Sequence, residues 1–234
     1  MTVQLHPDTL PFLQQLAMNN NRDWFNAHKE HWLEIKEAFE AFTQALIDEM
    51  SVADDTLKGL TAKNSVYRIY RDTRFSPDKT PYKTHVSCFL SSWGPKNSGV
   101  PGYYFQLGAE PAYGLEGTCT LGGGIFMPSP EALKAIRQEI FYCYNDFVDI
   151  METPAYKKYF GTEFFTTKKL QRVPTGYPTD WEYANLLKYK DYCTSYTMPD
   201  KLINSPRLFD EVIKVWKASL PLNRFLQRAM EGLH

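Results

Sequence analysis

The sequence lacks closely spaced cysteines. Its four cysteines are isolated, with no C-x-x-C pair, which excludes a zinc ribbon or a dense disulfide scaffold. The first residues have neither the basic region nor the apolar core of a secretory signal. No apolar run approaches the roughly 20 residues that span a bilayer. We therefore predict a cytoplasmic protein that needs no membrane, with its cysteines buried as small core residues: Cys88, Cys119, Cys143 and Cys193.

A large excess of charge of one sign is also missing. The formal net charge is −1, but it is unevenly distributed. Residues 1–59 carry four Lys or Arg against ten Asp or Glu, whereas residues 60–96 carry seven against two. The near-neutral total disfavours tight non-specific binding to nucleic acid, which depends on many Lys or Arg contacts to phosphate. A local basic patch within 60–96 remains compatible with this composition.

The composition is typical of a folded globular protein. Hydrophobic residues make up 43% of the 234 positions and charged residues 23%, which excludes a disordered chain. We find no internal repeat and no Ser/Gly-rich linker, so we predict a single domain over residues 1–234.

Hydrophobic periodicity predicts an α+β fold. Within residues 66–121 apolar and polar residues alternate, as is typical of half-buried strands. The links between these strands are too short for crossover helices, which favours an antiparallel sheet, and a further strand is expected at 192–197. N- and C-terminal helices are expected to pack on this sheet. The clearest helix covers residues 23–50, with Asn20 or Asn21 as its cap. Its apolar stripe consists of Phe25, His28, Trp32, Ile35, Phe39, Phe42 and Leu46. Ser129-Pro130 predicts the start of a helix that continues through Ile150, with Pro130 at its first position. Further helices are expected at 9–18, at 181–190 and within 206–231, and further strands at 103–107 and 113–121.

Familiar catalytic and metal motifs are weak or missing. His28-x-x-His31, followed by Glu34, has helical spacing but lacks the H-E-x-x-H order, so we assign no metal site. Gly122-Gly123-Gly124 fits no phosphate-loop pattern and indicates a strand end or bulge where backbones approach closely. There is no G-x-S-x-G elbow, and the sequence assigns no cofactor and no oligomeric state.

One segment, residues 67–83, combines cations with aromatic side chains. Arginine forms bidentate contacts with phosphate or carboxylate and stacks on rings. Ser76-Pro77-Asp78 predicts a turn that folds the second half of the segment back onto the first. Arg68 and Arg71 converge only if the strand ends at Tyr70, because alternate strand residues face opposite sides. The cations are Arg68, Arg71, Arg74, Lys79 and Lys83, and the aromatics are Tyr67, Tyr70, Phe75 and Tyr82.

This segment resembles the motif R-x-x-R-D-x-R-F-x-x-x-K-x-P-Y-K-x-x-x-G of a mostly bacterial family of uncharacterised proteins of about this length. Ser87 stands at the final glycine position of the motif, a change that we expect to affect the local backbone. The similarity extends to other parts of the chain, and the family is a domain of unknown function, so it implies no activity. The matching positions are Arg68, Arg71, Asp72, Arg74, Phe75, Lys79, Pro81, Tyr82 and Lys83, with Asn19-Asn20, Gly102-Tyr103-Tyr104, Gly122–Gly124 and Val173–Tyr177 elsewhere.

Three classes of function remain. The first is an enzyme acting on a phosphorylated or otherwise anionic small molecule, with Asp72 and His85 as the acid–base candidates. The second is a non-catalytic module for nucleotides or single-stranded nucleic acid, in which the aromatics stack on bases. The third is a structural or interaction protein, in which Asp72 pairs with Arg71 or Arg74 and only shapes the fold. We favour an anion site, with ligand-binding residues Arg68, Arg71, Arg74, Lys79, Tyr82 and Lys83.

Overall fold

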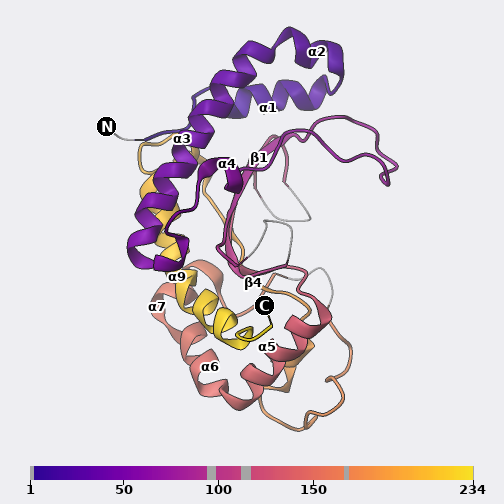
Figure 1. Ribbon diagram of the computed structural model, residues 1–234, viewed down its shortest axis with the longest axis vertical. Helices are drawn as coiled ribbons and strands as arrows, with labels where there is room; N and C mark the ends of the chain where they lie inside the picture. Colours follow the sequence, from indigo (N-terminus) through magenta and orange to yellow (C-terminus); the bar gives the residue numbers. More distant parts are fainter. Residues whose placement is uncertain (1–2, 94–98, 112–116, 166–168, 234) are drawn as a thin grey trace. The chain divides into compact units, whose positions relative to one another are not determined.

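The computed structural model describes residues 3–93, 99–111, 117–165 and 169–233, and it has the predicted α+β architecture (Figure 1). Within these residues an open antiparallel sheet of five strands has the order β1-β2-β3-β4, with β5 paired to β3. The strands are β1 (His85–Leu90), β2 (Gly102–Gly108), β3 (Cys119–Ile125), β4 (Tyr192–Cys193) and β5 (Tyr196–Thr197).

The chain divides into two compact units. Unit 1 comprises residues 1–90, 104–121 and 197–213, and unit 2 comprises residues 91–103, 122–196 and 214–234. Boundaries fall inside β2, β3, β5 and the last helix, α9 (Leu208–Ala229), so each of these elements belongs in part to both units. The expectation of a single domain stays a prediction.

Unit 1 is built on helix α3 (Lys29–Ala53), whose buried stripe was predicted correctly. Phe39 and Phe42 lie 6.1 and 5.9 Å, centroid to centroid, from the ring of Phe105 on β2, and they join the helix to the sheet. Phe209 at the start of α9 lies against Phe42 at 5.9 Å. The other helices of unit 1 are α1 (Thr9–Met18), α2 (Arg22–Ala27), the 3-10 helix η1 (Asp55–Leu57), α4 (Ala62–Ser65) and α8 (Asp200–Ile203).

The prediction of one unbroken helix from residue 23 to 50 was wrong. The helix is interrupted at His28, which separates α2 from α3 and has φ −112° and ψ 17°. The imidazole of His28 stacks on Trp24 at 4.1 Å, and its Nδ1 lies 2.8 Å from the Trp24 carbonyl oxygen. These local contacts stabilise the interruption, which a hydrophobic stripe alone does not reveal. Asn21, one of the two expected caps, accepts a hydrogen bond from the Trp24 N–H.

Unit 2 contains α5 (Pro130–Tyr142), α6 (Tyr144–Glu152), α7 (Pro154–Phe160) and the 3-10 helix η2 (Ala184–Lys188). Ser129 caps α5, and Pro130 occupies its first turn, as predicted. The expected continuation of this helix to Ile150 was wrong, because Cys143 leaves the helical conformation and separates α5 from α6. The expected helix at 181–190 is reduced to η2, and Trp181 instead packs on Phe141 at 5.0 Å.

The three consecutive glycines lie inside β3, which runs to Ile125 and not only to Leu121 as predicted. Residues 113–116 of the predicted strand lie outside the described residues. The glycines allow the close backbone approach that the sequence indicated. Gly123 N–H donates to Thr194 Oγ1 at 2.9 Å, and Gly124 N–H donates to Asn223 Oδ1 at 2.8 Å. The same Asn223 amide donates to the Gly102 carbonyl at 3.1 Å, so one fully buried side chain of α9 joins β2 to β3.

The expected strand at 192–197 is present as two short strands, β4 and β5. Helix α9 is continuous despite Pro221 in its interior. No disulfide joins any of the four cysteines, all of which lie among the described residues. None of the helices described is both long enough and apolar enough to cross a membrane.

Candidate functional site

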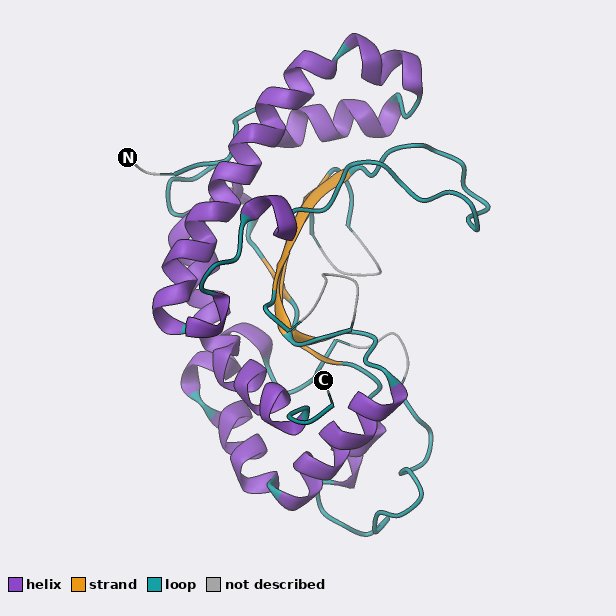
Figure 2. Cartoon of the chain, in the orientation of Figure 1, coloured by secondary structure: helices purple, strands orange, loops and turns teal. Residues whose placement is uncertain are grey.

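The basic and aromatic segment forms an extended hairpin in unit 1. Figures 1 and 2 show it as a long loop that leaves α4 and returns to β1. Its two arms pair through isolated antiparallel bridges, between Val66 and Cys88 and between Tyr70 and Tyr82. The pairing extends to Arg71, whose N–H donates to the Pro81 carbonyl at 2.9 Å. The chain reverses at a turn over residues 73–76, where Ser76 N–H donates to the Thr73 carbonyl at 3.4 Å, so the turn lies earlier than the one predicted at 76–78. We call residues 72–80 the hairpin tip.

The register of the two arms changes beside Arg68. Tyr67 N–H donates to Ser87 O at 2.9 Å, and Lys83 N–H donates to Ile69 O at 2.7 Å. Arg68 is therefore the single residue between these bonds on one arm, whereas three residues separate them on the other. Ser87, at the glycine position of the motif, is buried within β1 and takes part in this backbone pairing.

Tyr82 anchors the base of the hairpin. Its side chain is 4% exposed and stacks on Phe25 of α2 with ring centroids 4.0 Å apart. Burial, followed by the nearby Tyr70 hydroxyl, raises the pKa of Tyr82. The Asn20 side chain accepts from the Tyr82 N–H at 3.1 Å and donates to the Tyr82 carbonyl at 2.9 Å, so it pairs with this residue as a strand would. The ring that we expected to offer a ligand surface is thus occupied by an intramolecular contact.

Arg71 lies within a network of polar side chains at the tip. Its guanidinium donates to Asp78 and to the Thr80 hydroxyl and lies 3.5 Å from the Ser76 hydroxyl. Asp78 also accepts from Thr80 N at 2.9 Å. These bonds, first from the Thr80 backbone and then from Arg71, lower the pKa of Asp78 to about 2. Because the Arg71 side chain is only 25% exposed and several partners hold it, its first role is to fix the tip.

Arg74 and Asp72 form a bidentate ion pair on the surface. Arg74 Nε and Nη2 lie 3.0 and 2.7 Å from the two oxygens of Asp72. The hydrogen bond from Arg74 is the main cause that lowers the pKa of Asp72 to about 2, and the Arg68 charge contributes weakly. The Arg74 side chain nevertheless remains 77% exposed. The structural interpretation of the motif predicted that Asp72 pairs with Arg71 or Arg74. Asp72 does pair with Arg74, but the guanidinium of this pair is open to solvent.

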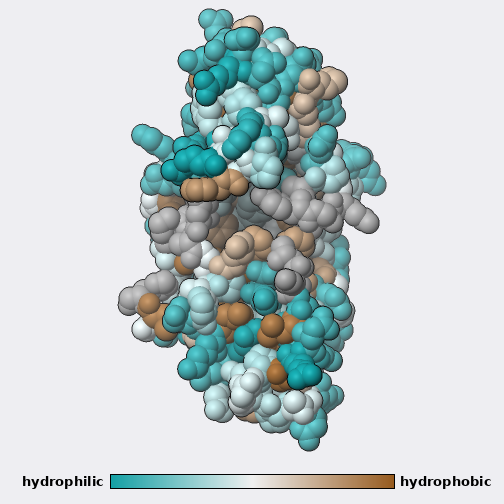
Figure 3. All heavy atoms as spheres, turned by 90° about the vertical axis from the view of Figure 1, so that its right-hand side faces the viewer, coloured by the Kyte–Doolittle hydropathy of each residue, from teal (hydrophilic) through white to brown (hydrophobic). Residues whose placement is uncertain are grey.

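Two further cations and one aromatic ring of residues 67–83 are exposed as well. Lys79 donates to the Thr73 carbonyl at 2.9 Å, and Arg68 projects into solvent. Phe75 is 92% exposed, and the Arg74 guanidinium lies 5.8 Å from its ring centroid. Figure 3 faces the side toward which the hairpin extends, and hydrophilic side chains predominate in the upper part of this view. Residues 67–83 contain five cations and two carboxylates, which gives a local net charge of +3.

Lys83 and His85 lie beyond the tip. The Lys83 ammonium is 5.0 Å from the centroid of the Tyr67 ring. His85 begins β1, and its Cβ lies against Gly108 of β2. Burial, aided by the Lys83 charge, lowers the pKa of His85 to about 4. An imidazole with this pKa stays neutral at pH 7 but is a weak base, because general bases work best with a pKa near the operating pH.

We expect His85 to make folding sensitive to acid. Its pKa is about 6.5 in the unfolded chain and about 4 in the folded one, so between these values the unfolded chain binds more protons. Lower pH then favours unfolding. Between pH 7 and pH 4.5 the free energy of unfolding should fall by about 2 kcal/mol more in the wild type than in a His85→Gln variant. Urea unfolding of both proteins at the two pH values measures this, and an equal loss in both would refute it.

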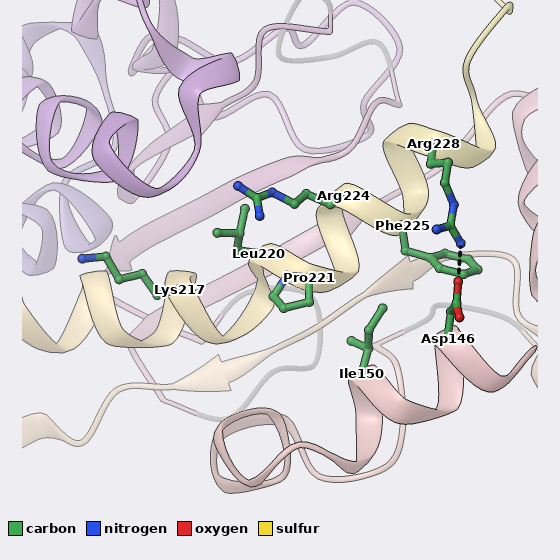
Figure 4. A pocket seen from close by; sticks show the side chains of 8 residues that line it. All are labelled: Asp146, Ile150, Lys217, Leu220, Pro221, Arg224, Phe225 and Arg228. Atoms are coloured by element: carbon green, nitrogen blue, oxygen red, sulfur yellow. Dashed lines mark hydrogen bonds and ion pairs between the residues drawn. The ribbon is translucent and has the colours of Figure 1, made fainter. Parts of the chain in front are cut away.

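A separate pocket of about 440 Å³ lies in unit 2 between α6 and α9 (Figure 4). Ile150 of α6 points toward Pro221 of α9, and Arg228 lies over Phe225 and reaches Asp146. Arg228 is bound by two carboxylates, Glu139 at 2.7 Å and Asp146 at 3.0 Å. Lys217 and Arg224 also line the pocket, and its other side chains are apolar.

The histidine pair considered for a metal is not brought together. His28 is stacked on Trp24, whereas His31 lies beside His6 and Asp8, which precede α1. Sequence reasoning missed this cluster because its members are distant along the chain. It also missed the role of Asn20, although the Asn19-Asn20 pair was among the positions of the resemblance.

The fold and site together define an α+β protein with an open antiparallel sheet and an arginine-rich hairpin. The chain belongs to the family described as conserved hypothetical protein (DUF2461), whose family model matches residues 8–225. This confirms the resemblance seen in the hairpin motif. No curated protein and no solved structure matches the chain.

Proposed function

We propose that this protein binds a phosphate-bearing ligand at the hairpin tip. The observation that carries the proposal is the exposure of Arg74 and Lys79 at the tip and of Arg68 on the arm that leads to it, with the Arg74 guanidinium beside the exposed ring of Phe75. Arginine forms strong, charge-assisted bidentate bonds with phosphate. A net charge of +3 over residues 67–83 attracts anions to the same place.

The residues that hold the hairpin in place differ from the exposed cations, and this supports the proposal. Its base is held by Tyr82, Phe25 and Asn20, and the shape of its tip is held by the bonds of Arg71. The fold therefore does not need Arg74 to keep the hairpin in place. Exposed ion pairs such as Arg74–Asp72 contribute little free energy, so a phosphate can replace or bridge this pair at small cost.

The hairpin tip is suited to binding a ligand rather than to acid–base catalysis. The pKa of Asp72, at about 2, keeps that carboxylate ionised, and the pKa of His85, at about 4, makes it a weak base. An acid–base catalyst at neutral pH needs a pKa closer to 7. Asp72 is better suited to hold Arg74 in a fixed orientation between binding events.

Single-stranded nucleic acid is a second candidate, favoured by the exposed rings. Phe75 is 92% exposed and Tyr70 51% exposed, and both lie among the cations. Proteins that bind single strands combine backbone-tracking cations with aromatic platforms for the bases. A small phosphorylated ligand, in contrast, needs only the cations.

A thermal-shift screen distinguishes these candidates. The probes are inorganic phosphate, nucleoside phosphates, sugar phosphates, a dicarboxylate and an oligothymidylate, each at low and high salt. A ligand at 100 times its Kd stabilises the folded state by about 2.7 kcal/mol, which raises the Tm by about 5–10 °C in a chain of this length.

We expect at least one phosphate-bearing probe to produce this shift and to lose it at high salt. A shift with the oligothymidylate that disappears in Phe75→Ala supports the nucleic-acid candidate, whereas a shift with small phosphates that survives in Phe75→Ala supports the small-molecule candidate. No shift with any phosphate would refute the proposal and favour a purely structural role of the motif.

A further inference from the structure

Three side chains with metal-binding atoms lie together at the start of unit 1. His6 and Asp8 precede or flank α1, and His31 lies in the first turn of α3. One ligand atom from each lies within 4.8 Å of the others. Among the described residues this is the one cluster of three such side chains, and it shares no residue with the hairpin.

The Nε2 atom of the His31 ring lies inside the cluster. Its side chain is 42% exposed, yet its Nε2 atom is buried and has no hydrogen-bond partner among the described residues. Asp8 Oδ2 lies only 3.3 Å from Nε2, a distance suited to an ion pair, but it is not aligned for a hydrogen bond. A buried imidazole nitrogen without a hydrogen bond is costly, because it loses water and gains no replacement.

The surroundings of the cluster restrict the orientation of both rings. The His6 and His31 rings meet edge to face at 5.7 Å, and the Phe12 ring lies 5.7 Å from His31. Phe12 is 5% exposed and shields this side of the imidazole from water. Two imidazoles and a carboxylate against an apolar ring are a donor set typical of divalent transition metals.

The separations are close to those of a metal site. Zinc bonds of about 2.1 Å put two tetrahedral ligands about 3.4 Å apart, and the 3.3 Å between His31 Nε2 and Asp8 Oδ2 matches this value. His6 lies in the segment before α1, outside regular secondary structure. The Nδ1 atom of His6 accepts a hydrogen bond from the Asp8 N–H at 3.2 Å, which a metal bound through that nitrogen would replace.

We infer that His6, Asp8 and His31 form a binding site for a divalent transition-metal ion, with zinc as the best-fitting probe. Three protein ligands leave a coordination position for water or another small ligand, as in many catalytic zinc sites. The ion would tie the segment before α1 to α3 and satisfy the buried Nε2 of His31. This inference is independent of the proposed anion site, because different residues carry it.

Titration of untagged, chelator-treated full-length protein with zinc chloride tests the inference. We expect one zinc ion per chain by calorimetry and by elemental analysis after dialysis. His31→Gln and Asp8→Asn should each weaken zinc binding at least tenfold. Asp8→Asn is a mild change for the fold, because the Asp8 side chain makes no capping hydrogen bond to α1.

Glu34→Gln is the matched control, since Glu34 is an exposed carboxylate one turn after His31 on the same helix. It should leave zinc affinity unchanged. Cobalt provides a second readout: its visible absorption should indicate nitrogen and oxygen ligands and vanish in His6→Ala. The inference is overturned if no stoichiometric zinc binds, or if both His31→Gln and Asp8→Asn bind zinc like the wild type while circular dichroism shows them folded.

Discussion

Replacing Gly124 with alanine should destabilise the protein by about 3–5 kcal/mol, the range of the most damaging single substitutions. Gly124 has φ +108°, a conformation that side chains with a Cβ rarely adopt. A Cβ there would also overlap the Tyr192 carbonyl oxygen and lie 2.8 Å from the Cys193 Cα. Both obstacles are backbone atoms of β4, so relief requires the β3–β4 pairing to separate.

Gly176→Ala is the matched control for this substitution. Gly176 has a similar φ of +96° and belongs to the same unit, but no atom lies within 4 Å of the position its Cβ would take. It should therefore cost about 1–2 kcal/mol, the backbone strain alone. Urea unfolding followed by circular dichroism measures both variants. Equal losses would show that the close approach of β4 to β3 contributes nothing to the effect.

Substitutions of the Arg74–Asp72 pair should change anion binding in opposite directions. Arg74→Ala removes the most exposed guanidinium of the tip and should weaken binding of a phosphate-bearing probe at least tenfold. Asp72→Asn removes the carboxylate that competes with the ligand and raises the local net charge, so it should strengthen binding several-fold. Fluorescence anisotropy with a labelled nucleotide or oligothymidylate measures both changes.

Arg172→Ala is the control for a general loss of positive charge, because Arg172 is an exposed arginine of unit 2. It should bind the probe as the wild type does. If the hairpin pair is only structural, Asp72→Asn and Arg74→Ala will both reduce stability by similar amounts and neither will alter probe binding. Weaker binding in Asp72→Asn would likewise contradict the view that Asp72 competes with the ligand.

The sequence predicted the parts of the fold that depend on local pattern. The stripe through Ile35, Phe39 and Phe42 identified the buried face of α3, and Ser129-Pro130 identified the start of α5. The interruptions at His28 and Cys143 were not predictable in this way. The interruption at His28 is stabilised by local contacts such as its stack on Trp24. The hydrophobic periodicity that was used to predict the helices continues across both interruptions.

The candidate site was predictable in composition but not in arrangement. A chain reversal within residues 67–83 and a pairing of Asp72 with Arg71 or Arg74 were expected. The structure has the reversal, with its turn at 73–76 rather than 76–78, and it pairs Asp72 with Arg74. The partner of Arg71 is Asp78 rather than Asp72, because the turn brings residues 71 and 78 together across the tip. The pairing of Asn20 with Tyr82 joins residues 62 positions apart, a separation at which local pattern carries no information.

The most direct test of the proposed function is to locate the bound anion on the arginine side chains. Nitrogen-15 NMR of the guanidinium groups during titration with the best phosphate-bearing probe follows each arginine separately. We predict that the Arg68 and Arg74 signals shift and saturate together, while those of Arg172 and Arg228 stay in place. Shifts centred on Arg224 and Arg228, which line the α6–α9 pocket, or no shift at the hairpin tip at saturating probe, would contradict the account.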